Sequence, residues 1–181
     1  MTDRSKKAAL FLVILLAALG VSPAGATIES RSSSEVLILD LEGPINPGSA
    51  LYVERGILEA ELRGAPLVVL RVDTPGGLAS SMRTMVKAIV NSTVPVAVYV
   101  GPRGAGAASA GVMVTVAGHV AAMAPGTNIG AAHPVAAGGK DIQEEMSKKV
   151  VNDMASYGRG IAEEKGRNGE GVEKAIRESV S

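Results

Sequence analysis

Residues 67–77, Leu67-Val-Val-Leu-Arg-Val-Asp-Thr-Pro-Gly-Gly77, decide the fold of this chain. A short apolar run that ends in a Pro-Gly-Gly turn is typical of a buried strand that stops at the edge of a sheet. Apolar residues at helical spacing precede this run over 50–63 and follow it over 80–91. Residues 36–41 and 94–100 are two further runs of the buried-strand type. The alternation of strands and helices predicts a mostly parallel α/β sheet.

The stretch after the third strand contains the candidate nucleophile. Residues 101–111, Gly-Pro-Arg-Gly-Ala-Gly-Ala-Ala-Ser-Ala-Gly, surround Ser109 with alanine and glycine. A serine that attacks an acyl group needs small neighbours, because the substrate and backbone amides must both approach its hydroxyl. We expect a helix over 107–115 that carries Ser109 near its N-terminus, where free amides favour negative charge. Ser109 and the pair Gly76-Gly77 follow the carboxyl ends of consecutive strands, so we expect them on one rim of the sheet.

The rest of the chain continues the same alternation. Residues 119–123 are expected to form a strand, and the small residues of 124–134 a loop that lines a cleft. After a glycine-bearing connection at 135–140, helical spacing predicts a helix over 143–164 and a weaker one over 171–179.

Composition narrows the classes of function. The 181 residues are 46% apolar, which suits one globular domain with a sizeable core. A formal net charge of zero and an aromatic content of 2% argue against a nucleic-acid partner, which needs basic surfaces or stacking platforms. Cysteine is absent, which excludes disulfides and thiolate catalysis, and no metal or cofactor site is predicted.

The N-terminus has the pattern of a secretory signal peptide over residues 1–26. A basic start at 4–7 precedes an apolar run, and Ala24-Gly-Ala26 supplies the small residues that signal peptidase recognises. We expect cleavage after this tripeptide, a polar linker over 27–35 and one domain over 36–181, exported to the periplasm or to the extracytoplasmic face of the membrane. An uncleaved membrane anchor is the alternative for the apolar run.

A serine nucleophile needs a base, for which the sequence offers several candidates. Neither histidine has an acidic neighbour that would orient it, so each is expected to have a structural role. A lysine is the better candidate, because desolvation in an apolar cleft lowers the lysine pKa from its reference value of about 10.4. The candidate bases downstream of the serine are His119, His133, Lys140, Lys148 and Lys149.

Three ordered motifs resemble a known family. Asp-Thr-Pro-Gly-Gly at 73–77, Gly-Ala-x-Ala-Ala-Ser-Ala-Gly at 104–111 and the run Ala-Ala-Met-Ala-Pro-Gly-Thr-Asn-Ile-Gly-Ala-Ala-His-Pro at 121–134 resemble the NfeD-type membrane-bound serine proteases of the ClpP class, relatives of signal-peptide peptidase A. The resemblance covers nearly all of the chain after the leader. It implies a ClpP/crotonase-like fold of repeated β-β-α units and a Ser-Lys catalytic dyad.

The resemblance also assigns roles to individual residues. It makes Ser109 the nucleophile and Lys149 the base, with Lys148 as the neighbouring alternative. The backbone amides of Gly77 and Ala110 would form the oxyanion hole. The residues expected to contact the substrate are Gly76, Gly126 and Asn128.

The implied activity is that of a serine endopeptidase that cleaves apolar segments of membrane-associated proteins through an acyl-enzyme. The same resemblance implies a stomatin-like membrane partner, a homo-oligomer, no cofactor and a membrane-associated full-length protein. Members of the family continue with further protease elements, membrane spans and a small β-barrel, so we expect the domain to be incomplete at its C-terminal end. Two alternatives stay open: a ClpP-like scaffold without turnover, and a crotonase-like acyl-CoA enzyme, although these loops contain few carboxylates and a secretory leader separates the chain from acyl-CoA.

Overall fold

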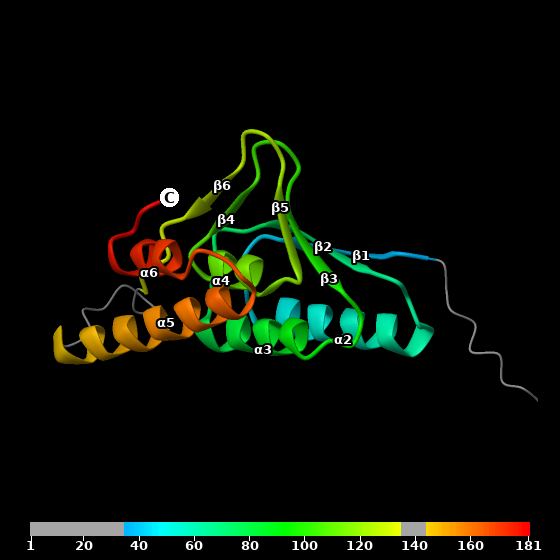
Figure 1. Cartoon of the computed structure of the whole chain (residues 1–181), viewed down its shortest axis with the longest axis horizontal. Coiled ribbons are helices and arrows are strands. Elements are labelled where there is room, and N and C mark those ends of the chain that lie inside the picture. The colour runs from blue at the N-terminus through cyan, green and yellow to red at the C-terminus, as the bar shows by residue number, and fades with distance from the viewer. Residues whose placement is uncertain (1–34, 135–143) are drawn as a thin grey trace, which may run out of the picture. The chain divides into compact units, whose positions relative to one another are not determined.

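Four parallel strands form the main sheet within residues 35–134 and 144–181, the part of the chain that this computed structural model describes. The strands β1 (Leu37–Glu42), β2 (Val68–Asp73), β3 (Val96–Val100) and β5 (Val120–Met123) follow one another in this order across the sheet (Figure 1). Each neighbouring pair is parallel. The predicted parallel α/β sheet is therefore confirmed, with strand bounds that lie within two residues of those expected. The predicted leader at 1–26 lies outside the described residues.

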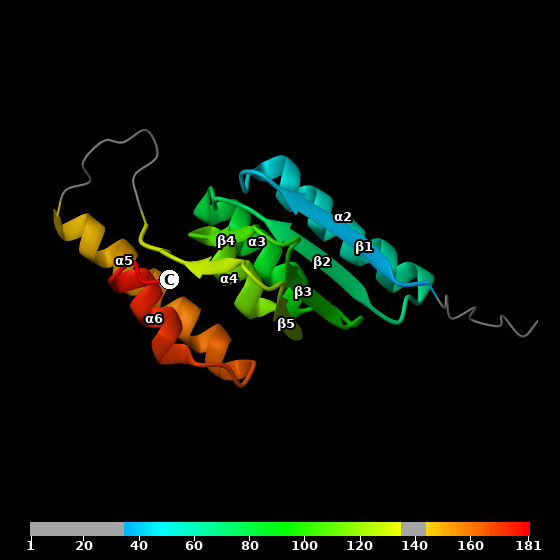
Figure 2. The same cartoon turned by 90° about the horizontal axis from the view of Figure 1, so that it is seen from above.

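Two helices cover one face of this sheet. Figure 2 shows the strands in front of α2 (Pro47–Arg63) and α3 (Ala79–Val90). Side chains alternate between the two faces of a strand, so every second residue points at these helices. Leu70 of β2 and Val98 of β3 are fully buried there. The core is built from aliphatic residues and methionine, as the low aromatic content requires.

Three further helices lie within the part of the chain that the structure describes. The short helix α4 (Ala110–Ala117) is buried along its whole length and packs between α3 and the long helix α5 (Glu144–Glu164). Helix α6 (Gly169–Arg177) packs along α5. The helices predicted over 143–164 and 171–179 are confirmed within two residues at each end. Among the described helices, none has both the length and the hydropathy that a membrane span requires.

Two very short strands were not predicted. Among the described residues, β4 (Gly106–Ala108) and β6 (Asn128–Gly130) form a second parallel sheet. Residues 107–108 are strand and not the expected helix, and residues 128–130 are strand and not the expected loop, so both expectations are wrong. Runs of glycine and alanine have no apolar period to mark a strand. These strands instead depend on backbone hydrogen bonds between distant segments, such as the 3.3 Å bond from the Asn128 amide to the Ala105 carbonyl.

Isolated bridges extend the second sheet toward the turn after β2. Thr74 pairs with Ala107 in β4, and Ile45 pairs with Gly77. Each main strand is thus followed by a short extended segment and then by a helix: Ile45 precedes α2, Thr74 precedes α3, β4 precedes α4 and β6 precedes α5. The repeated β-β-α units expected from the resemblance are present, and they collect the short segments at one rim.

Both histidines make backbone contacts, as expected for structural residues. The Nδ1 atom of His119 accepts a 3.1 Å hydrogen bond from the Val96 amide, at the end where β3 and β5 begin. The Nδ1 atom of His133 lies 3.0 Å from the Ile176 carbonyl, to which it donates when it carries the proton. Neither side chain lies among the residues that line the cavity beside Ser109, described below.

We expect protonation of His119 to destabilise the fold. Burial and, after it, the charges of Lys165 and Arg167 lower the pKa of His119. The unfolded chain therefore binds the proton more readily than the folded one. The neutral His119 side chain favours the folded state fully above about pH 6.5, and this contribution to the free energy of unfolding is lost as the pH falls through the lowered pKa. Thermal unfolding followed from about pH 8 to about pH 5 should show this loss. The side-chain carbonyl of His119→Asn can accept the hydrogen bond from the Val96 amide at every pH, so this variant should lose less thermal stability over the same pH range. Equal losses of stability in both proteins would contradict the explanation.

Candidate active site

Ser109 occupies the sharp turn between β4 and α4. It is the N-cap residue of α4 and has φ 51° and ψ −117°, a backbone conformation that side-chain-bearing residues rarely adopt. Strain of this kind persists where the surrounding structure imposes it, and it is frequent at functional sites. A strained strand-to-helix turn also exposes a serine hydroxyl at the top of a sheet in the nucleophile elbow of hydrolases. The Ser109 side chain makes no capping bond to the helix, so its hydroxyl is not committed to the fold.

The turn after β2 lies directly against this serine. A Cβ atom added to Gly76, which has φ +99°, would lie 2.5 Å from the Ser109 Cβ and 3.1 Å from the Ala110 amide nitrogen. At Gly77, which has φ +153°, it would lie 2.1 Å from the Ile45 carbonyl oxygen. Both positions therefore require glycine for backbone conformation and for space. The Pro-Gly-Gly turn brings backbone, without side chains, against the serine.

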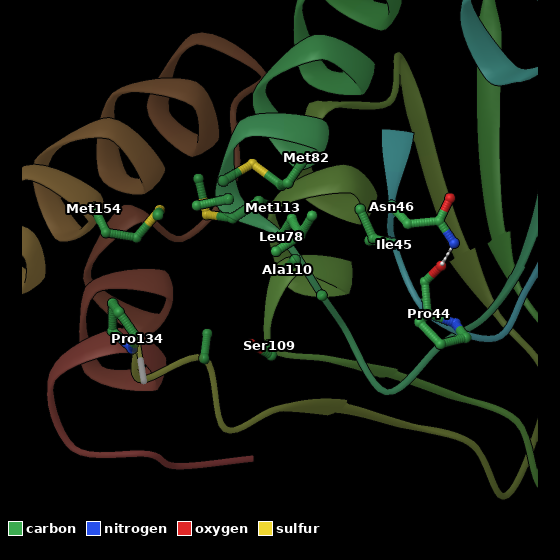
Figure 3. A pocket seen from close by; sticks show the side chains of 13 residues that line it. Pro44, Ile45, Asn46, Leu78, Met82, Ser109, Ala110, Met113, Pro134 and Met154 are labelled. Atoms are coloured by element: carbon green, nitrogen blue, oxygen red, sulfur yellow. Dashed lines mark hydrogen bonds between the residues drawn. The ribbon is translucent and has the colours of Figure 1, made fainter. Parts of the chain in front are cut away.

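A cavity of about 550 Å³ opens beside Ser109 (Figure 3). Methionines from three helices, α3, α4 and α5, form one wall, and the segment between β1 and α2 lies on the other side. No charged side chain is among the described residues that line it. Such a lining favours an apolar ligand. The lining residues are Pro44, Ile45, Asn46, Gly77, Leu78, Ala79, Met82, Ser109, Ala110, Met113, Ala132, Pro134 and Met154.

The two predicted oxyanion positions lie at this cavity with the serine. Gly77 and Ala110 both line it. Ala110 is the first residue of α4, and the first amides of a helix have no partner within the helix. The same amides stand at the positive end of the helix dipole. Ser109, Gly77 and Ala110 thus line one cavity, and acyl transfer requires a hydroxyl and backbone donors that lie close together in this way.

Lys149 does not join this group in the structure. Its side chain is 69% exposed, and its Nζ atom lies 3.3 Å from the Glu145 carboxylate, one turn earlier on α5. The residue of α5 that lines the cavity is Met154, five positions later, which is about 140° around a helix with 3.6 residues per turn. Lys148 is also exposed and lies about 120° from Met154 by the same geometry. Lys140 lies outside the described residues.

None of the three predicted substrate contacts is among the described residues that line the cavity. Gly76 is buried beneath Ser109. Gly126 accepts a 3.2 Å hydrogen bond from the Gly104 amide, and Asn128 packs against Gly106 of β4; neither lines the cavity. The loop that contains them does reach the cavity, at its later end. The lining residues from that end are Ala132 and Pro134.

The methionine wall was missed as part of the site. Met82 falls within the helix expected over 80–91, for which the sequence predicts no functional role. Spacing contained a usable signal: Met113 follows Ser109 by four residues, and residues four apart share one face of a helix. Met154 had no such signal, because its place at the cavity depends on how α5 packs against α4.

The fold is that of an α/β protein of the ClpP type. A solved ClpP1 from Listeria monocytogenes matches 76% of this chain and 77% of its own with a TM-score of 0.60; at 23% identity this likeness concerns the fold alone. The chain belongs to the family of NfeD1b N-terminal domains, whose model matches residues 35–179.

Similar proteins include membrane-bound protease PH1510 of Pyrococcus horikoshii, 37% identical over 149 residues, and membrane protein NfeD1b of Bacillus subtilis, 34% identical over 148. These matches cover 81% and 82% of the chain, which spans about a third of the length of either relative. A serine-to-alanine mutant of the 1510-N membrane-bound stomatin-specific protease matches 80% of this chain and 70% of its own, with 35% identity and a TM-score of 0.74. A lysine-to-alanine mutant of the same 1510-N protease, in complex with a substrate peptide, matches 80% of this chain and 67% of its own, with 34% identity and a TM-score of 0.73.

We expect Gly76→Ala to damage the site far more than Gly104→Ala. Both glycines have positive φ, +99° and +88°, but an added Cβ at Gly104 meets no atom within 4 Å. The backbone conformation alone should cost Gly104→Ala about 1–2 kcal/mol of unfolding free energy. Gly76→Ala should cost about 3–5 kcal/mol, because the methyl also displaces Ser109. Denaturant unfolding measures both; equal losses would mean that the close approach to Ser109 is unimportant.

Proposed function

We propose that this chain is a serine endopeptidase domain in which Ser109 attacks the peptide carbonyl and the amides of Gly77 and Ala110 bind the oxyanion. The observation that carries the proposal is the strained strand-to-helix turn at Ser109, which faces an apolar cavity shared with both residues. The protease names of the similar proteins agree with it. Donors fixed around a developing oxyanion typically lower the barrier by about 3–4 kcal/mol each.

Lys149 is our proposed general base. Its neutral amine takes the proton of Ser109 as the hydroxyl oxygen attacks the carbonyl carbon. The tetrahedral intermediate then collapses: the C–N bond breaks, and the leaving amine receives that proton from the lysine. A water molecule, deprotonated by the same amine, cleaves the acyl-serine ester and restores the enzyme. In the related 1510-N mutants, the replaced serine and lysine are one residue further apart in sequence than Ser109 and Lys149.

The dyad requires the first turns of α5 to reorient. In the described conformation Lys149 is paired with Glu145 on the exposed side of the helix. Exposed ion pairs contribute little to stability, so this one opposes a rearrangement weakly. Further along α5, Asp153 and Tyr157 are tied to Arg83 of α3, by an ion pair of 2.5 Å and by stacking of the guanidinium 4.3 Å from the ring centre. We propose that these contacts with Arg83 hold the later part of α5 in place. In the active state, the first turns of α5 then move and bring Lys149 toward Ser109.

The proposed substrate is an apolar segment of a membrane-associated protein. The uncharged, methionine-lined cavity supports this choice, since methionine adapts its shape to varied apolar side chains. The names of relatives as membrane-bound or stomatin-specific proteases point in the same direction. A stomatin-like partner, assembly of several copies and a location at the extracytoplasmic face of the membrane belong to the same proposal.

A scaffold without turnover is the second candidate function, and one observation favours it: the described position of Lys149 away from Ser109. The acyl-CoA alternative has no such support, because the described residues that line the cavity include no carboxylate for acid-base work. Peptide cleavage that depends on Ser109 would decide between the protease and the scaffold.

Ser109→Ala should abolish cleavage of a fluorogenic apolar peptide, with a loss of at least about 10³-fold. The fold should remain, since the serine side chain makes no capping bond and alanine occupies the same space. Circular dichroism and the thermal midpoint check the fold in parallel with the rate. A variant that still cleaves at the rate of the unmodified chain would refute the nucleophile.

Lys149→Ala should reduce the rate as far as Ser109→Ala, because the members of one catalytic unit are not additive. Lys149→Arg keeps the positive charge beside Glu145 but cannot supply a neutral amine, so it should be equally inactive. Lys148→Ala should change the rate by less than about threefold, as exposed substitutions usually do. Activity retained in Lys149→Arg would assign Lys149 a structural role, and inactivity of Lys148→Ala alone would move the base by one position.

A further inference from the structure

We propose that Thr74 is a positioning residue for the oxyanion hole: its hydroxyl holds the Pro-Gly-Gly turn against Ser109. Thr74 follows β2 and is 3% exposed. It lies in a motif for which only the two glycines were given roles. The inference rests on the proposed acyl-transfer function of Ser109.

The hydroxyl of Thr74 connects two turns. Its Oγ1 atom donates a 2.7 Å hydrogen bond to the Gly43 carbonyl, in the turn after β1, and accepts a 3.0 Å bond from the Gly76 amide. The Gly76 carbonyl lies farther away, at 3.4 Å from Oγ1. Since a hydroxyl has one proton, the shorter contact to Gly43 takes it and leaves a lone pair for the Gly76 amide. A single buried oxygen therefore joins the turn after β1 to the Pro-Gly-Gly turn after β2.

The backbone and the methyl group of Thr74 contact residues on both sides of Ser109 in the sequence. Its amide donates to the Gly106 carbonyl at 2.8 Å, and its carbonyl accepts from the Ala108 amide at 3.0 Å, in the residue that precedes Ser109. The methyl carbon would lie 2.6 Å from a Cβ atom added to Gly111, two residues after Ser109. Thr74 thus contacts the strand before the nucleophile, the helix after it and the turn that supplies the proposed oxyanion donor.

The Ile45 backbone holds the later part of the turn: its amide donates a 2.7 Å bond to the Gly76 carbonyl, and its carbonyl accepts a 2.9 Å bond from the Leu78 amide. The Thr74 hydroxyl holds the earlier part, at the Gly76 amide. Gly76 and Gly77 both have positive φ and no side chain to pack, so their amides keep one direction only if hydrogen bonds fix them. Oxyanion donors act through preorganisation, and a shift of about 1 Å can cost about 10²-fold in rate. Without the Thr74 hydroxyl, the Gly76 amide and the Gly43 carbonyl both lose this partner, and the glycine pair beside Ser109 is left with the bonds to Ile45.

Thr74→Val tests this directly, because it replaces the hydroxyl by a methyl group of similar size. With a fluorogenic apolar peptide, we expect kcat to fall about 10- to 100-fold while KM stays within about twofold. Thr74→Ser keeps the hydroxyl and should restore kcat to within about threefold of the unmodified chain. Thr115→Val is the matched control: Thr115 is 2% exposed and its hydroxyl bonds to the Gly111 carbonyl at 2.8 Å within α4, so the same chemical change there should leave kcat within about twofold.

A second readout does not depend on turnover. Hydrogen exchange of the Gly76 amide, followed by NMR in the Ser109→Ala background, should accelerate at least about tenfold in Thr74→Val and stay unchanged in Thr74→Ser and Thr115→Val. Unchanged Gly76 exchange in Thr74→Val, or a kcat equal to that of the unmodified chain, would overturn the inference. If Ser109→Ala cleaves as fast as the unmodified chain, the proposed function fails instead, and Gly76 exchange alone then decides whether Thr74 holds the turn.

Discussion

The contact between the backbone of Gly76 and the side chain of Ser109 is the constraint on which the site depends. The two are so close that a single added methyl would lie 2.5 Å from the serine Cβ. This approach is possible only because a glycine with positive φ meets a serine in a strained conformation. The sheet, the short strands and α4 all contribute to holding these two residues in place.

The parallel sheet supplies the frame for that contact. Strands β2 and β3 are in register and parallel, so the turn after β2 and the segment after β3 leave the sheet at one rim. There the two segments are joined by hydrogen bonds of Thr74 to Gly106 and Ala108, and β6 holds the serine from the far side through a 3.3 Å bond from the Ser109 amide to the Gly130 carbonyl. Buried helix α4 begins at the cavity with its first residue, Ala110. The chemistry proposed for Ser109 thus follows from the way consecutive β-β-α units place their short segments side by side.

Much of this arrangement could be predicted from the sequence, for identifiable physical reasons. Apolar runs and helical spacing located the main strands and the long helices, because burial imposes a period on them. The small residues around Ser109 and the glycines at 76 and 77 marked a place where backbones approach closely. The short strands β4 and β6 could not be predicted, because their positions depend on pairing between segments far apart in the sequence. The place of Met154 at the cavity depends in the same way on packing of α5. Lys149 shows the limit most clearly: its assignment as base came from resemblance, and the rotation of α5 places it on the exposed side of the helix.

We propose that the strained turn makes Ser109 a nucleophile in an apolar, amide-lined site. The most direct measurement is peptide mapping by mass spectrometry after the full chain has been incubated with an apolar peptide phosphonate, a reagent that forms a covalent bond with an activated serine. We expect a single adduct per chain, located on Ser109 and suppressed by an excess of apolar peptide. Peptide cleavage without any adduct on Ser109, or an adduct on another serine, would contradict it.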